Sequence, residues 1–261
     1  MSHFLMHPAT GKCFSTGWVP DRLDHRDVKY TAPSGAAVDP SIPIDYRAGL
    51  PPVYDQGPLG SCVGNGTAAA FQYALMRESA KHVFQPSRLF IYYNARNREG
   101  NASQDAGCEI RDAIKSLNED GVVPEASWPY NVRKFATHPP APLYQQALQN
   151  QLIVYARVDQ TQDHMLACLS HHGLIVFGAS VFQEIMDAPG GHIPMPDPNA
   201  EPVGGHCMVV VGWRPDSKEY IIRNSWGTNW GDHGYGYMPA DYLHNTDLAS
   251  DFWVLWLTEK P

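Results

Sequence analysis

Four side chains that are far apart in the chain could together attack a carbonyl group: the Cys62 thiol, the His206 imidazole and the amides of Asn224 and Gln56. A thiol becomes an effective nucleophile when a base lies within hydrogen-bonding distance, and a third group is needed to orient that base. Asn224 could accept a hydrogen bond from one imidazole nitrogen and leave the other nitrogen facing Cys62. This set of residue types predicts covalent catalysis through a thioester.

Cys62 lies at the junction between a shaped turn and a helix. Residues 55–66 are rich in glycine and include Pro58, whereas residues 67–76 consist largely of good helix formers. The positive end of a helix dipole favours a thiolate over a thiol, and the thiolate is the nucleophilic form. The alternative for Cys62 alone is a buried structural cysteine, because free cysteines are among the most buried residues.

The sequence around His206 and Asn224 predicts that these two side chains meet. His206 follows two glycines and opens an apolar strand, and Asn224 ends the next strand. A turn at residues 214–217 would make the two strands antiparallel neighbours. Trp226 follows Asn224 closely, and its indole could cover the hydrogen bond between Asn224 and His206 from water. Four other histidines, at 164, 171, 172 and 192, are expected to be superficial or structural, because they form no metal-binding motif.

Composition excludes several classes of function. Of the 261 residues, 43% are hydrophobic and 18% are charged, as in a globular protein. The net charge of −8 and the lack of a basic run disfavour nucleic acid as a partner. No apolar run is long enough to suggest a membrane span. The first residues do not resemble a signal peptide, so we expect either a cytoplasmic protein or export by a non-standard route.

The cysteine pattern argues against a structural metal site. The five cysteines, at 13, 62, 108, 168 and 207, include no CxxC pair. We expect them to be mostly reduced, and we expect neither a metal nor a cofactor.

The distribution of elements predicts an α+β fold with two lobes. Helices are expected from about residue 62, from residue 86, at 108–117 and at about 161–171, with proline-broken loop at 122–144. Strands are expected at 174–181, 207–213, 220–224, 234–238 and 252–256. A helical first half followed by a strand-rich second half is typical of α+β proteins.

Three motifs resemble those of the papain-like cysteine peptidases. The run Gln-Gly-Pro-Leu-Gly-Ser-Cys at residues 56–62 resembles the motif around the family's nucleophile, and Gly205 with His206 resembles the histidine motif. Residues 224–231, Asn-Ser-Trp-Gly-Thr-Asn-Trp-Gly, are very close to the asparagine motif and are the most specific of the three. The resemblance extends from about residue 44 to 256. The runs at 17–21 and 249–253 are similar to the bacterial, xylellain-like branch of the family.

The resemblance implies a role for each matching residue. Cys62 corresponds to the nucleophile, His206 to the general base and acid, and Asn224 to the residue that orients the histidine. The Gln56 amide and the Cys62 backbone N–H correspond to the oxyanion hole. The pair of Cys62 and His206 is expected to lower the pKa of the thiol and to support activity from mildly acidic to neutral pH.

Substrate-binding residues follow from the same resemblance. Gly107 corresponds to the glycine that meets extended substrate backbone, and Gly178 and Cys207 correspond to the main specificity pocket. Cys108 or Ile110 is expected to form another wall, and Trp226 is also assigned to substrate binding. The family fold has a helical lobe and an antiparallel, β-barrel-like lobe with the cleft between them.

The chain departs from the family pattern in three respects. Val63 stands where the family usually has tryptophan, the cysteines that usually pair near the cleft are not at matching positions, and the long helical propeptide is absent. We expect residues 1–43 to be an extension and residues 44–261 to be the peptidase domain. Its helical lobe would be mainly 60–145 and its β lobe mainly 150–256. The extension could lie across or beside the cleft with Trp18 as an anchor, or pack behind the β lobe.

The sequence therefore predicts a monomeric endopeptidase that acts on a peptide or protein. Two alternatives remain open at this point. One is a papain-fold binding protein with little turnover, although such a protein has no need of all four reactive residues. The other is an acyl transferase, which would usually have Asp in the third position rather than Asn224.

Overall fold

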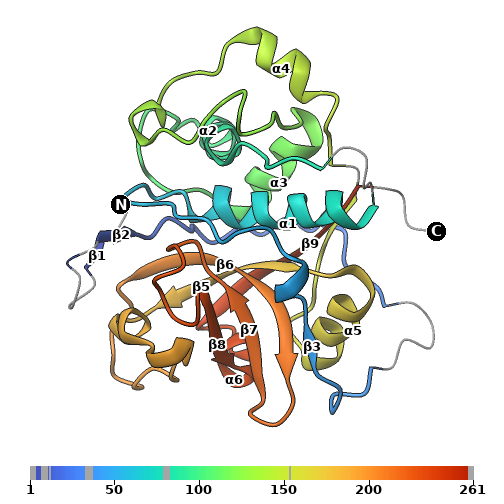
Figure 1. The fold of residues 1–261 in the computed structure, drawn as a ribbon, viewed down its shortest axis with the longest axis vertical. Coiled ribbons are helices and arrows are strands. Elements are labelled where there is room, and N and C mark those ends of the chain that lie inside the picture. The colour runs from blue at the N-terminus through green and yellow to red at the C-terminus, as the bar shows by residue number, and fades with distance from the viewer. Residues whose placement is uncertain are drawn as a thin grey trace.

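The computed structural model of this chain describes residues 4–6, 11, 13–32, 38–78, 83–152 and 154–257. In Figure 1 the longest helix, α1 (Cys62–Glu78), crosses the middle of the molecule. On one side of it lie α2 (Arg88–Arg98), α3 (Ile110–Glu119) and α4 (Ala141–Ala147), and on the other side lies a large sheet. The predicted α+β architecture with two lobes is confirmed.

The sheet has seven strands, and every pairing in it is antiparallel. Its order is β4 (Val154–Arg157), β9 (Ala249–Trp256), β5 (Ile175–Val181), β6 (Gly204–Arg214), β7 (Glu219–Arg223) and β8 (Tyr235–Pro239). The seventh strand, β3 (Ile44–Asp45), pairs with β6. The last strand of the chain thus lies between β4 and β5, inside the sheet.

Shorter elements complete the fold. The strands β1 (Phe4–Met6) and β2 (Cys13–Ser15) form a separate pair. The helices α5 (Gln162–His172) and α6 (Ala240–His244) contact the sheet. Four 3-10 helices, η1 to η4, span Arg47–Gly49, Val132–Lys134, Gln183–Asp187 and Pro189–Gly191. The prediction of a loop throughout 122–144 is wrong at η2 and at the start of α4, where Pro140 precedes the first turn and prolines are compatible with a helix start.

Alternation along the strands divides the apolar core into two parts. Val176, Val209 and Trp253 belong to the core that also contains the buried faces of α1, α2 and α3. Their neighbours in sequence, such as Val210 and Val254, belong to the core on the opposite face of the sheet, with α5 and α6. Successive side chains of a strand point to opposite faces, so each buried strand supplies both cores. This explains why the strands are apolar almost throughout.

The helix α3 shows how the helical side is attached. Ile110, Ala113, Ile114 and Leu117 are fully buried, and they follow the spacing of one helix face. Gly121, which has a φ of 71°, comes soon after the helix ends. The predicted helix and its buried face are confirmed, although the helix begins at Ile110 rather than Cys108.

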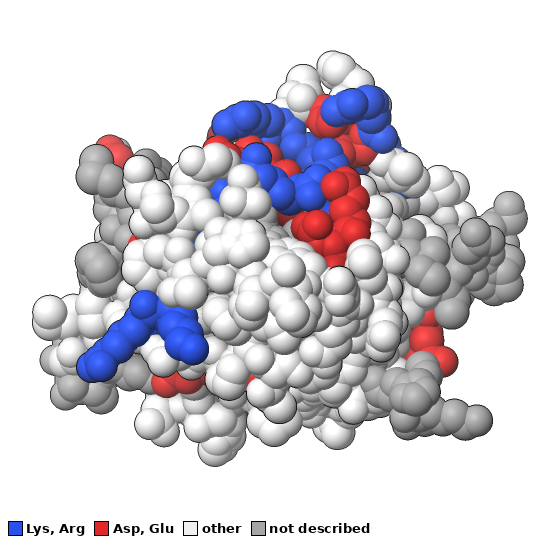
Figure 2. Space-filling model, turned by 90° about the horizontal axis from the view of Figure 1, so that it is seen from above, with Lys and Arg blue, Asp and Glu red and all other residues white. Residues whose placement is uncertain are grey.

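The surface matches the mixed charge of the sequence. Figure 2 shows Lys and Arg side chains interleaved with Asp and Glu at one edge of the face seen from above, while most of that face is neither. Within the described ranges, no helix combines the length and the hydropathy that a bilayer crossing requires.

Candidate active site

Cys62 is the first residue of α1 and is completely buried. The turn before it is held by its own backbone and by Asp105, whose carboxylate accepts from the Gly60 N–H at 3.1 Å. Burial raises the pKa of the Cys62 thiol to about 11, although backbone N–H groups, among them those of Cys207 and Gly17, partly offset it. The expected lowering of this pKa is therefore wrong for the arrangement seen here, because the thiol has been removed from water.

His206 and Asn224 meet as predicted. The β6–β7 hairpin pairs Val209 with Arg223, so that Asn224, next after Arg223, lies beside the start of β6. His206 Nε2 is 2.7 Å from Asn224 Oδ1. Burial lowers the pKa of His206 to about 4, and the Asn224 hydrogen bond acts in the opposite direction. Among the described residues, His206 Nδ1 is buried and has no hydrogen-bond partner.

The pKa shifts of Cys62 and His206 make both groups neutral near pH 7 in this arrangement. A neutral thiol is a poor nucleophile, because the thiolate is the reactive form. In the arrangement described here, the Cys62 thiol and the His206 imidazole therefore lack the charges of a reactive pair. The cause is burial, and the cover is supplied by the N-terminal segment described below.

Trp226 covers the imidazole as the sequence suggested. Its ring centroid is 4.5 Å from that of His206, and the Trp226 side chain is fully buried. Trp230 meets Trp226 edge-on at 5.6 Å, and Phe14 stacks on it at 4.9 Å. The apolar rings keep water away from the His206–Asn224 hydrogen bond, which strengthens that bond electrostatically.

Gln56 is fixed by a residue that the sequence analysis missed. The Ser225 hydroxyl donates to Gln56 Oε1 at 2.6 Å, and the Gln56 backbone N–H donates to the Ser225 carbonyl at 2.8 Å. With Oε1 occupied in this way, the Gln56 amide N–H groups point elsewhere. They donate to the carbonyls of Leu59 and Ser15, at 2.9 and 2.8 Å. The feature of the sequence that could have identified Ser225 is its position next to Asn224.

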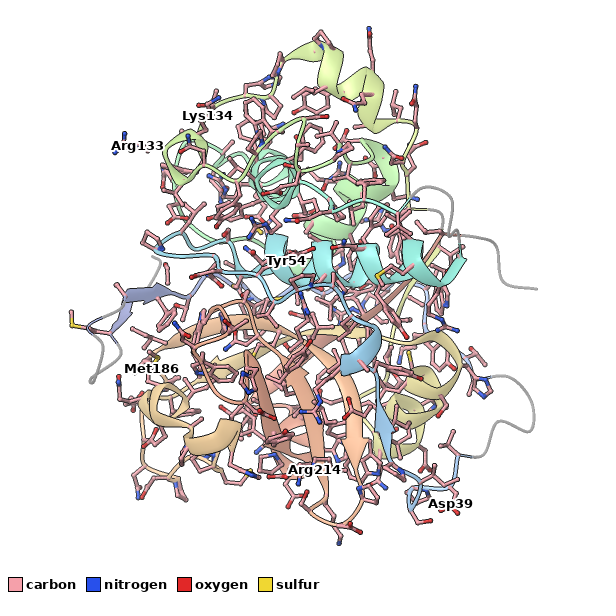
Figure 3. The ribbon with its side chains drawn as sticks, viewed as in Figure 1. Asp39, Tyr54, Arg133, Lys134, Met186 and Arg214 are labelled. Carbon is pink, nitrogen blue, oxygen red and sulfur yellow. The ribbon has the colours of Figure 1, made fainter. Side chains whose placement is uncertain are left out.

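The loop that carries Gln56 is also anchored to the helical side. Tyr54 lies beside α1 in Figure 3, between the helices and the sheet. Its carbonyl accepts from the Gly227 N–H at 2.9 Å, and its ring lies 4.8 Å from the Arg88 guanidinium carbon. Arg88 also lies 4.1 Å from the Tyr130 ring centroid and forms an ion pair with Glu125 at 2.9 Å. Gln56 is therefore held between two halves of the fold.

Residues 13–32, which we call the N-terminal segment, cross this site. The N–H groups of Gly17 and Trp18 both donate to the Gly205 carbonyl at 3.0 Å. On the opposite side, the Cys108 N–H donates to the Gly17 carbonyl at 2.9 Å, and the Val19 N–H donates to the Cys108 carbonyl at 3.1 Å. The segment is thus hydrogen-bonded both to the sheet, next to His206, and to the helical side, next to α3.

Trp226, on which Phe14 of this segment stacks, is one of the five predicted substrate-binding residues, and three of the other four also contact the segment. A Cβ atom on Gly107 would lie 2.1 Å from the Gly17 carbonyl oxygen, and one on Gly178 would lie 1.9 Å from the Trp18 ring. Cys108 forms the hydrogen bonds given above. The fourth, Cys207, pairs with Gly178 across β5 and β6, and its sulfur lies 3.0 Å from the position of a Cβ on Gly66 in α1. Its side chain is therefore directed toward α1.

A cluster of charged residues holds the far end of the segment. Arg157 Nη2 contacts Asp21 at 2.8 Å and Asp251 at 2.7 Å, and Arg111 contacts Asp27 at 2.6 Å. Burial, and next the Asp251 charge, raise the pKa of Asp21 to about 6. These residues are distant in sequence, and no motif connects them.

None of the five cysteines, all within the described ranges, is in a disulfide. Within those ranges there is also no cluster of three or more His, Cys, Asp or Glu that could hold a metal ion.

Comparisons with known proteins show which family this chain resembles. The model of the papain family cysteine proteases matches residues 42–254. An uncharacterized peptidase C1-like protein of Acanthamoeba polyphaga mimivirus is 39% identical over 212 residues, which are 77% of this chain and 68% of that protein. A cysteine protease of Blomia tropicalis is 26% identical over 225 residues, or 81% and 65% of the two chains. This chain thus spans about two thirds of the length of these relatives.

A solved structure is similar over nearly the whole chain. Xylellain, a cysteine protease from Xylella fastidiosa, superimposes with a TM-score of 0.86 at 39% identity. The match covers 94% of this chain and 96% of that one.

Proposed function

Since this chain belongs to the papain family of cysteine proteases, we propose that its peptidase reaction is carried out by Cys62, His206, Asn224 and Gln56. The observation that supports this most directly is the 2.7 Å hydrogen bond between His206 Nε2 and Asn224 Oδ1. The next residue, Cys207, has its backbone N–H at the Cys62 sulfur. The His206–Asn224 bond fixes the imidazole and leaves Nδ1 to exchange a proton with the thiol.

The proposed reaction has two stages. His206 Nδ1 takes the thiol proton, and the Cys62 sulfur bonds to the carbonyl carbon of the substrate. The oxyanion that forms is stabilised by the Gln56 amide and the Cys62 N–H, donors that act mainly on charge developing in the transition state. His206 then gives its proton to the leaving amine as the peptide bond breaks. Water, deprotonated by His206, attacks the thioester, and the acid leaves as the sulfur is released.

We propose endopeptidase action for the same site. Residues 13–21 pass across it as one continuous chain, from Phe14 on Trp226 to Asp21 beside Arg157. A chain can thus be accommodated on both sides of Cys62, as cleavage within a polypeptide requires. A protein or peptide is the substrate in this proposal.

The N-terminal segment is proposed to restrain the enzyme. The Ser15 carbonyl accepts from the Gln56 amide, which is the donor that the oxyanion needs. The segment group that acts on the sulfur is a different one, the Gly17 N–H. The carbonyl that accepts from the Gln56 amide thus belongs to Ser15, whereas the N–H at the sulfur belongs to Gly17, two positions later. The segment fills the site without presenting one peptide bond to both groups, and so it is not itself cleaved.

A labelling experiment tests the assignment of the nucleophile. An epoxide inhibitor of papain-like enzymes is expected to modify Cys62 alone among the five cysteines, faster when the N-terminal segment is displaced by the substitution Trp18→Ala. Peptide mass mapping identifies the modified residue. Labelling of another cysteine in preference to Cys62 would contradict the proposal, and a papain-fold binding protein without turnover predicts no labelling at all.

The pKa shifts predict how pH acts on the closed arrangement. The pKa of His206 falls from its usual 6.5 to about 4, so its contribution favours closure above pH 6.5 and is lost as the pH falls through 4. The pKa of Asp21 rises from 3.8 to about 6, so its contribution favours closure below pH 3.8 and is lost as the pH rises through 6. The two effects oppose each other between about pH 4 and 6.

Replacing Asp21 with asparagine is therefore expected to leave the His206 effect unopposed. In Asp21→Asn, the closed population should fall as the pH is lowered from about 6.5 to 4, whereas in the natural chain it should change much less. The NMR signal of the Trp18 indole N–H reports the two populations. Identical pH profiles for the two proteins would show that Asp21 does not contribute in this way.

A further inference from the structure

We infer that Tyr130 is a positioning residue for the oxyanion hole. Its hydroxyl joins the two parts of the chain that supply the oxyanion donors, the loop of Gln56 and the turn that ends at Cys62. Tyr130 acts through these neighbours and does not itself touch the substrate. The inference rests on the proposed function, because the two donors belong to the site proposed there.

The Tyr130 hydroxyl lies between Gln56 and Ser61. Its oxygen is 2.8 Å from the Gln56 carbonyl oxygen and 2.5 Å from Ser61 Oγ. The Gln56 side chain carries one oxyanion donor, and the other is the Cys62 N–H, which shares a peptide group with the Ser61 carbonyl. A peptide group is planar, so whatever fixes the Ser61 carbonyl also fixes the direction of the Cys62 N–H. One hydroxyl is therefore bonded to both arms of the oxyanion hole.

The chemistry of the groups sets the direction of these two hydrogen bonds. A carbonyl oxygen can only accept, so the single proton of the Tyr130 hydroxyl is donated to Gln56. Ser61 therefore donates its own proton to the Tyr130 oxygen. Burial raises the pKa of Tyr130 to about 12, so the phenol keeps its proton at the mildly acidic to neutral pH expected for activity.

Ser61 is held in turn by the first turn of α1. Asn65 Nδ2 donates to the carbonyl and to the hydroxyl of Ser61, at 2.9 and 3.1 Å, and the Asn65 backbone N–H donates to the same carbonyl at 3.0 Å. Arg88 Nη1 donates to Asn65 Oδ1 at 3.2 Å, which fixes the orientation of that amide. Every hydrogen bond from Arg88 to the Gln56 carbonyl thus points the same way, and aligned bonds polarise and strengthen one another.

The rest of Tyr130 is anchored independently of its hydroxyl. The Arg88 guanidinium carbon lies 4.1 Å from the ring centroid, and the Tyr130 N–H donates to Glu125 Oε1 at 2.9 Å. Glu125 Oε1 also accepts from Arg88 Nη2 at 2.9 Å, so the ring and the backbone are both fixed to α2. The substitution Tyr130→Phe keeps these contacts and removes only the link between Gln56 and Ser61.

The test is made in the full chain with Trp18→Ala, which opens the site. In the closed arrangement the Trp18 ring fills a pocket beside Gly178, and its Nε1 donates to Asp251 Oδ2 at 3.2 Å. In this background, Tyr130→Phe is expected to lower kcat for a fluorogenic peptide about tenfold, less than the roughly 10²–10³-fold typical of removing a donor outright. KM should stay within about twofold, because the oxyanion exists only after the substrate has bound.

Two inhibitors separate positioning from general damage. A peptide nitrile adds the Cys62 S–H across its carbon–nitrogen triple bond, and the thioimidate nitrogen then lies where the oxyanion would. Its inhibition constant should rise by about the same factor as kcat falls. The Cys62 sulfur displaces iodide from iodoacetamide without forming an oxyanion. The rate of this alkylation, followed by mass spectrometry, should be unchanged.

A second tyrosine provides the matched control. The Tyr144 hydroxyl, on α4, donates to Asn94 Oδ1 at 2.7 Å. Tyr144→Phe removes a hydrogen bond of the same kind from the helical side, and it should lower the stability while leaving kcat within about twofold.

Ser61→Ala removes the link from its other end. It should weaken the nitrile and leave the alkylation rate unchanged. Combined with Tyr130→Phe, it should lower kcat by less than the product of the separate effects, because the two hydroxyls act through one hydrogen bond. Should Tyr130→Phe fail to fold, Ser61→Ala with the same two inhibitors decides.

The failures of the two proposals are distinguishable. An unchanged kcat in Tyr130→Phe, an equal loss of alkylation rate, or fully multiplicative effects with Ser61→Ala would overturn this inference while hydrolysis and Cys62 labelling remain. If the Trp18→Ala chain cleaves no peptide and Cys62 is not labelled, the proposed function itself is wrong, and this inference is wrong with it.

Discussion

Replacing Cys62 with alanine is expected to lower kcat/KM for a fluorogenic peptide by a factor on the order of 10⁶, as loss of a nucleophile does in enzymes that form an acyl intermediate. The reason is that Cys62 supplies the sulfur that forms the thioester in the proposed reaction. Initial rates should be measured in the full chain with Trp18→Ala, where the site is open and the reference rate is high.

A second cysteine provides the control for this substitution. Cys168 is also outside any disulfide and fully buried, but it lies in α5 on the opposite face of the sheet. Cys168→Ala is expected to lower the stability of the protein and to leave kcat/KM within about twofold for the folded fraction. Full activity in Cys62→Ala would refute the assignment of the nucleophile.

Trp18→Ala is expected to raise the peptidase activity of the full chain by about 10²–10³-fold, because truncating a buried tryptophan typically costs about 3–5 kcal/mol. That cost falls on the closed arrangement alone, since Trp18 has no partner in the pocket once the segment has left. The equilibrium between the closed and open states therefore shifts toward the open state. Hydrolysis of a fluorogenic peptide by freshly purified protein measures the change.

The control for Trp18→Ala is in the same segment. Leu23 is a large apolar residue that is 84% exposed, so Leu23→Ala removes no buried contact and should leave the rate unchanged. A shortened chain that lacks residues 1–40 should match or exceed the activity of Trp18→Ala. Equal turnover by the natural chain and the shortened chain would show that the segment does not restrain the enzyme.

Local patterns in the sequence were enough to predict the main helices and strands. The apolar face of α3 follows from spacing alone, and the meeting of His206 with Asn224 follows from two apolar strands joined by a short turn. The class of enzyme was predicted from three motifs, and the comparisons confirm it. In each of these cases the decisive contacts are either close in sequence or repeated within a recognisable pattern.

Contacts between distant residues without a pattern could not be predicted. The carboxylates of Asp21 and Asp251 meet at Arg157 only because β9 lies between β4 and β5, and nothing in the sequence of β9 indicates its neighbours. Similarly, the Ser225 hydroxyl that holds Gln56 belongs to a motif whose more obvious members are Asn224 and Trp226. The pKa of Cys62 is raised, rather than lowered as expected, because the thiol is buried. The N-terminal segment helps to bury it, and the path of that segment could only be hypothesised from the sequence.

The contact between Trp18 and Asp251 joins residues that are 233 positions apart. A ribosome makes Trp18 long before Asp251, so this contact cannot form until the chain has been synthesised through Asp251. The same delay applies to the catalyst, because the sheet that supports His206 lacks its inner strand β9 until then. The pocket that holds Trp18 is thus finished only when β9 has joined the sheet, and from that moment the segment, which was made long before, can close the site.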